Sequence, residues 1–175
     1  MKPADERIAI EAALDTYRAR LDQIPDEAFD LTPAGGGWSY AEVYDHMMKS
    51  TIGASIALEK STQSSCVPTN KKPNLMGRLL LLFGRFPPVK TTVPDSVANT
   101  IGPAKITKED ARNLIIKCRR RVDTVMSLIA NSKNNCRVNH PRLGMLNARQ
   151  WLKFIRIHLQ HHLKQLGRIE NKFSM

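Results

Sequence analysis

The sequence has no long apolar run. Its densest apolar stretch, residues 79–83, is far shorter than the roughly 20 apolar residues that a transmembrane helix requires. The first seven residues have no apolar core and include two acids, so they do not resemble a secretory signal. We therefore expect a cytoplasmic protein without a transmembrane segment.

Cysteine is also scarce, with three residues in a chain of 175. Cys66, Cys118 and Cys136 are widely separated and form no C-x-x-C pair. An odd number at such spacing favours neither a disulfide framework nor a cysteine zinc site. Cys118 follows an apolar helical pattern and is interpreted as a core residue. No chemistry is assigned to any of the three.

Acidic residues are outnumbered, and the formal net charge is +11. Such a charge favours anionic partners: nucleic acid, an acidic membrane surface or an anionic small molecule. The basic residues are, however, spread along the chain without interleaved aromatic residues, which favours the simpler interpretation of solvated helix faces. Hydrophobic residues make up 42% and charged residues 25%, as in a globular protein. Residues 1–175 are expected to form a single domain.

What the sequence does contain is helical periodicity. Apolar residues recur at spacings of three and four, and S-x-x-E-like capping boxes precede several of these stretches. No convincing strand alternation is present. The pattern predicts an all-α four-helix bundle. The expected helices span residues 4–24, 39–61, 107–129 and 147–171.

The connection between the second and third helices, residues 64–103, is long and rich in proline. Prolines forbid a long helix there, although residues 75–83 fit a short one. We expect the apolar run of this insertion to be buried against the bundle. A lid or a contact with a second subunit are the alternatives.

The histidines carry the functional hypothesis. His158 and His162 lie one turn apart on the apolar stripe of the last helix, and His46 lies on that of the second. Buried imidazoles at this spacing can share one divalent ion, which requires them to be neutral. Three protein ligands leave a position open for water or substrate, as in catalytic sites. The alternative is that these histidines are ordinary core residues.

Other polar residues near these positions receive weaker assignments. Gln165 follows His162 by three residues and either lines the same pocket or packs at a helix interface. Asp45 is a candidate pocket residue or a solvated acid. His161 points about 60° away from His158 and is expected to be peripheral. His140, which precedes a proline, is expected to be structural.

Two stretches resemble a known family. Residues 37–46 (GWSYAEVYDH) and the segments 140–147, 150–151 and 158–166 are similar to the two signatures of DinB-like proteins. The resemblance implies an up-down-down-up bundle that is often a homodimer. It also implies nickel, zinc or iron at the histidines. Some relatives transfer low-molecular-weight thiols or isomerise thiol adducts. The basic insertion at residues 64–103 departs from the family pattern.

The resulting hypothesis is a metal-dependent enzyme that activates a water or a thiol for attack on a small-molecule electrophile, as a hydrolase or a thiol S-transferase. The sequence has no H-E-x-x-H glutamate, so metalloprotease chemistry lacks its base. Two alternatives stay open. One is a non-catalytic bundle that binds an anionic ligand on its basic surface, and the other is a metal-free interaction protein.

Overall fold

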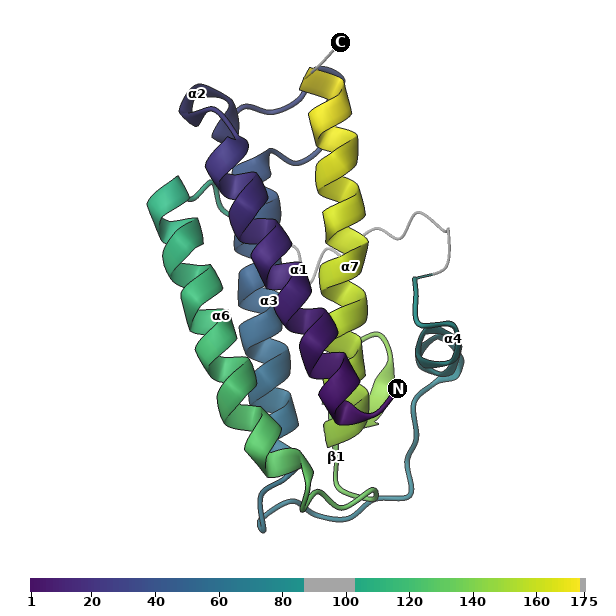
Figure 1. The fold of residues 1–175 in the computed structure, drawn as a ribbon. Helices are drawn as coiled ribbons and strands as arrows, with labels where there is room; N and C mark the ends of the chain where they lie inside the picture. Colours follow the sequence, from purple (N-terminus) through teal and green to yellow (C-terminus); the bar gives the residue numbers. More distant parts are fainter. Residues whose placement is uncertain (87–102, 174–175) are drawn as a thin grey trace.

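The computed structural model describes residues 1–86 and 103–173 and consists mainly of four long helices. In Figure 1, α1 and α7 run in one direction along the bundle, and α3 and α6 run in the other. Each of α1 and α3 packs against both α6 and α7. The expected all-α, up-down-down-up four-helix bundle is therefore confirmed. The long helices are α1 (Pro3–Gln23), α3 (Tyr40–Lys60), α6 (Lys108–Ile129) and α7 (Ala148–Phe173).

Local capping explains where three of these helices begin. In each case a polar side chain accepts the backbone N–H of the residue three positions later, and that residue's side chain bonds back to the backbone N–H of the cap. These bonds satisfy amide groups that the first helical turn leaves without a partner. The capping boxes are Ser39 with Glu42, Thr107 with Asp110, and Asn147 with Gln150.

Two elements were not expected from the sequence. A short helix, α2 (Asp26–Phe29), follows α1, and an antiparallel hairpin of β1 (Arg137–His140) and β2 (Gly144–Asn147) precedes α7. The sequence showed no strand alternation, so this hairpin is an addition to the predicted helical bundle. Each strand has only four residues, too few for a recognisable alternation. Leu146 is fully buried, so the hairpin caps the core at one end of the bundle.

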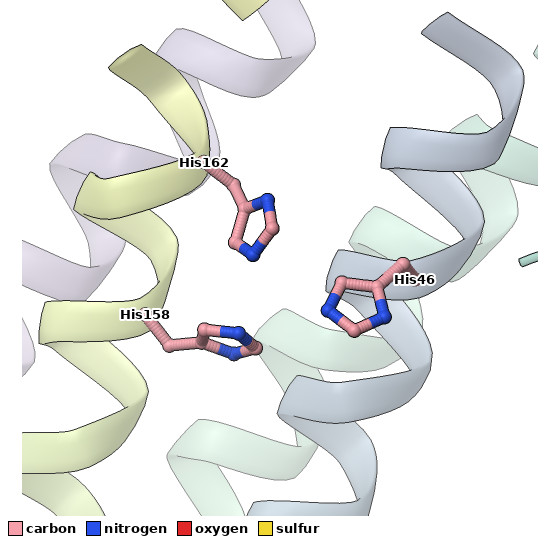
Figure 2. A group of neighbouring side chains, drawn as sticks. All are labelled: His46, His158 and His162. Carbon is pink, nitrogen blue, oxygen red and sulfur yellow. The ribbon is translucent and has the colours of Figure 1, made fainter. Parts of the chain in front are cut away.

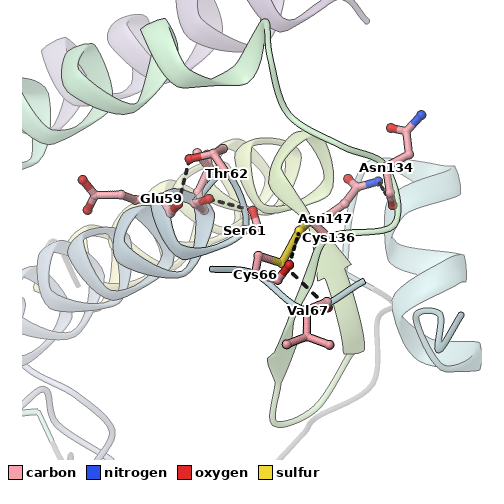
Figure 3. The surroundings of a disulfide bond; sticks show 9 residues. Glu59, Ser61, Thr62, Cys66, Val67, Asn134, Cys136 and Asn147 are labelled. Atoms are coloured by element: carbon pink, nitrogen blue, oxygen red, sulfur yellow. Dashed lines mark hydrogen bonds between the residues drawn. A yellow bond between two sulfur atoms is a disulfide. The ribbon is translucent and has the colours of Figure 1, made fainter. Parts of the chain in front are cut away.

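The structure also corrects the interpretation of the cysteines. Cys66 and Cys136 form a disulfide, with their Cα atoms 5.8 Å apart (Figure 3). The bond links the segment after α3 to the segment that leads into β1. Their separation of 70 residues gave no sign of this pairing. Cys118 is free and buried on α6, as expected for a core residue.

Inside the long connection, α4 (Leu75–Phe83) has the predicted bounds. The prediction that its apolar run is buried was wrong for Leu79, Leu82 and Phe83, which are exposed. Leu80 is buried, and Leu81 packs partly buried against the core. No helix among the described residues is both long and apolar enough to cross a bilayer.

A buried ion pair joins the first and last helices. The Arg156 guanidinium on α7 donates to the Glu6 carboxylate on α1, and both residues are buried. The guanidinium also donates to Gln160, at 2.8 Å. Glu6 thus joins α1 to α7. Removing one partner would leave a buried charge without compensation.

We expect Arg156→Met to lower the free energy of unfolding by about 3–5 kcal/mol, because it leaves the Glu6 carboxylate buried without a positive partner. The double variant Glu6→Leu/Arg156→Met should recover most of that loss. Urea denaturation followed by circular dichroism measures both. Arg7→Met is the control, since it breaks the exposed Arg7–Asp123 pair and should cost less than about 1 kcal/mol. Equal losses in Arg156→Met and Arg7→Met would contradict the role given to the buried pair.

Candidate metal centre

Three histidines meet between α3 and α7. His46 extends from α3, while His158 and His162 extend from consecutive turns of α7 (Figure 2). One ligand nitrogen from each imidazole lies within 4.8 Å of the other two. The ring centroids are 5.4 Å apart for His46 and His158, 5.0 Å for His46 and His162, and 4.8 Å for His158 and His162.

This geometry fits a divalent ion. Metal–nitrogen bonds of about 2.0–2.1 Å in a tetrahedral site place the ligand nitrogens about 3.4 Å apart. The ligand nitrogens lie within 4.8 Å of one another, so side-chain rotations would have to bring them to that separation. No described carboxylate or thiol belongs to the group. A metal held here would therefore keep at least one coordination position free for water or substrate.

The surroundings keep the imidazoles neutral, which is the form that binds metals. Burial, with smaller contributions from the nearby His46 and His161, lowers the pKa of His162 to about 3. Burial, followed by the charges of His162 and His46, holds the pKa of His158 well below its usual value. Burial also lowers the pKa of His46, although Asp45 partly opposes this effect. At neutral pH the three lone pairs are therefore available.

Gln165 contacts the site directly. Its side-chain oxygen lies 2.6 Å from Nδ1 of His162. An amide oxygen can only accept, so this contact favours the tautomer in which Nδ1 carries the proton and Nε2 carries the lone pair. Bonds of this kind orient metal-binding histidines in proteins. Both Gln165 and His162 lie on α7, one turn apart.

Aromatic rings surround the imidazoles. Trp38, just before α3, is stacked with His162 at a centroid distance of 6.3 Å and lies 4.9 Å from His46. Phe154 stacks on His158 at 5.1 Å. Phe86, after α4, lies 5.8 Å from His158 and 4.7 Å from His161. The sequence singled out only Trp38 among them, as part of a family signature. Phe154 lies one turn before His158, but nothing local indicated Phe86.

The environment of Asp45 matches neither of the two interpretations from the sequence, which were a pocket residue and a solvated acid. It is buried rather than solvated, and its carboxylate accepts the N–H of Ala104 at 2.9 Å and lies 2.6 Å from Nζ of Lys49. Among the described residues, its hydrogen bond and ion pair are to Ala104 and Lys49 rather than to a site imidazole. Asp45 thus links the segment before α6 to α3. Its negative charge partly offsets the lowering of the His46 pKa by burial.

The other two histidines lie outside the group. His161 is adjacent to His162 but faces Phe86. His140 ends β1, where its ring lies 5.3 Å from Trp151 and 4.7 Å from Phe154. Its Nδ1 accepts the N–H of Arg142 at 3.1 Å, which stabilises the hairpin turn.

Fold and site together define a class: up-down-down-up helical bundles with three imidazoles converging between two antiparallel helices. Within this class the chain belongs to the DinB superfamily, whose sequence model matches residues 9–166. The matched region includes all three histidines.

Individual proteins are similar over nearly the whole chain. The Bacillus subtilis (strain 168) protein YuaE, described as uncharacterized, is 24% identical over 165 residues, covering 94% of this chain and 96% of YuaE. The crystal structure of TT2238, a four-helix bundle protein, has a TM-score of 0.61 at 16% identity and covers 95% of this chain and 99% of its own. YfiT from Bacillus subtilis has a TM-score of 0.66 at 12% identity, and the match covers 99% of this chain and 88% of the YfiT chain. YfiT is described as a probable metal-dependent hydrolase with an unusual four-helix bundle topology.

The half-buried position of His140 predicts acid sensitivity. Burial, then the charge of Arg142, lowers its pKa from 6.5 to about 4. Between these values the unfolded chain binds a proton that the folded protein does not, so stability falls as the pH falls. His140→Asn keeps an acceptor for Arg142 but does not titrate. We expect its unfolding free energy to decrease less than that of the wild type between about pH 7 and about pH 4.5.

Urea denaturation at a series of pH values measures this difference. The three histidines of the site are the same in both proteins, so their contributions cancel. If the unfolding free energies of wild type and His140→Asn changed equally with pH, the lowered pKa of His140 would be contradicted.

Proposed function

We propose that the protein is a metal-dependent hydrolase that holds one divalent ion on His46, His158 and His162 and acts on a small-molecule substrate. The observation that carries the proposal is the convergence of three neutral imidazoles from two helices within 4.8 Å. The description of YfiT as a probable metal-dependent hydrolase supports the same reaction class. A set of three imidazoles suits zinc, nickel or iron, and we favour nickel or zinc.

A divalent ion bound here supplies Lewis acidity and makes a nucleophile available near neutral pH. The protein's own residues prepare the site for it. Burial keeps the imidazoles deprotonated, and Gln165 holds His162 in one tautomer. Trp38, Phe86 and Phe154 form apolar walls that limit access of water to the rings. Since no described carboxylate joins the histidines, we assign no general base among the side chains.

Other expectations from the sequence belong to the same proposal. A low-molecular-weight thiol at the open position would make the protein a thiol S-transferase. We also propose one domain over residues 1–175, with 64–103 as an insertion, and a homodimer as the assembly. We keep the cytoplasm as the proposed location. The Cys66–Cys136 disulfide argues against it, because disulfides persist mainly in oxidising compartments.

The competing function is a bundle that binds an anionic ligand without turnover, for which the net charge of +11 is the supporting observation. This alternative does not require the histidines. Binding of nucleic acid that weakens with salt and persists in His46→Ala would favour it.

Metal analysis of the purified protein tests the proposed site. We expect about one divalent ion per chain in the wild type, and loss of most of it in His46→Ala, His158→Ala and His162→Ala, because two imidazoles hold an ion much less tightly than three. Hydrolysis of activated ester and amide substrates should be lost with the metal. His161→Ala is the matched control, as it removes an imidazole next to the site and should keep the ion. Metal-free wild type, or equal metal in all four variants, would exclude the site.

Gln165 provides a finer test. Gln165→Leu removes the acceptor from Nδ1 of His162 and replaces the amide with an apolar side chain. We expect the metal affinity to drop by about 10- to 100-fold, the usual effect of losing such a partner. Competition with a chromogenic chelator measures it. Lys164→Leu, at an exposed neighbouring position, serves as the control. An unchanged affinity in Gln165→Leu would mean that the contact does not orient the ligand.

A further inference from the structure

The outer face of α4 is apolar. Of the twelve large apolar side chains that are exposed in the described part of the chain, five belong to this nine-residue helix. At 100° per residue they fall within a sector of about 120°, so they form one continuous strip. Single exposed apolar residues are common, but a contiguous group marks an interaction surface. The exposed fractions are 73% for Leu75, 38% for Met76, 40% for Leu79, 74% for Leu82 and 64% for Phe83.

The packing of α4 fixes this face outward. A Cβ on Gly77 would lie 2.4 Å from the carbonyl oxygen of Leu143, so the helix lies directly on the hairpin backbone. Asn74 caps the helix by accepting the N–H of Gly77 at 2.9 Å, and its own N–H donates to the Leu143 oxygen at 2.9 Å. Leu80 on the inner side is fully buried. The helix therefore cannot turn its apolar strip inward without losing these contacts.

Positive charge borders the strip. Lys71, Lys72, Arg78 and Arg85 are all exposed, and none forms an ion pair among the described residues. The sequence contains no aspartate or glutamate between Glu59 and Asp95. An apolar helix face with a basic border is complementary to a membrane interface, where acyl chains take the apolar side chains and anionic headgroups meet the cations.

Other partners fit less well. A symmetric contact between two copies through this strip would bring the two basic borders together without acids to pair with them. Nucleic acid would satisfy the cations but not the five apolar side chains. We therefore propose that α4 and its basic border, Lys71, Lys72, Arg78 and Arg85, form a docking surface for an anionic lipid membrane. This proposal does not depend on the metal site.

Sedimentation with vesicles tests the proposal on the full-length protein. We expect binding to phosphatidylcholine vesicles that contain about one third phosphatidylglycerol, and little binding to pure phosphatidylcholine. Leu82→Gln/Phe83→Gln should weaken binding to the anionic vesicles by at least about tenfold, because two exposed apolar side chains no longer enter the interface. Lys71→Gln/Lys72→Gln should weaken it by about fivefold per residue, and added salt should weaken it further.

The matched control is Ile8→Gln/Ile116→Gln, which replaces two exposed apolar residues on α1 and α6. It should bind the anionic vesicles like the wild type, and all variants should keep the wild-type circular dichroism. No binding by the wild type, or equal loss in the control, would overturn the proposal. So would a dimer in solution that Leu82→Gln/Phe83→Gln converts to a monomer without any vesicle binding, since the strip would then join two copies.

Discussion

The contact between α3 and α7 determines the properties of the candidate site. One helix can bring two imidazoles together at a spacing of four residues, as α7 does with His158 and His162, but the third must come from a neighbour. The antiparallel packing of α3 supplies His46 at the same level. The same contact buries the rings and lowers their pKa values, so proximity and neutrality have a common cause.

Signals that lie within a few residues of one another were sufficient to predict most of the fold. Capping boxes such as Ser39 with Glu42 fix a helix start through bonds three residues apart, and the structure contains these bonds. Apolar stripes gave the orientation of each helix, because a side chain on the stripe must face the core. The direction of the helices did not follow from these signals and came from the family resemblance.

What the sequence did not predict depends on contacts between distant residues. The Cys66–Cys136 disulfide and the Glu6–Arg156 ion pair join residues that no local pattern relates. The same distinction between local patterns and distant contacts applies to the candidate metal centre. The stripes placed three histidines on interior faces, whereas the buried bonds of Asp45 and the ring of Phe86 depend on the path of the long connection.

That path also explains why α4 leaves its apolar strip exposed. Gly77 allows the helix to approach the hairpin backbone closely, Leu80 is fully buried beside it, and Leu81 packs partly buried against the core. Gly84 then ends the helix with a left-handed backbone at φ +65°, a conformation that costs glycine little. Two residues later the chain places Phe86 against His158. The face of α4 that holds Gly77 and Leu80 thus lies against the hairpin and the core, the apolar strip lies on the outer face, and the chain that leaves the helix brings Phe86 to the candidate metal centre.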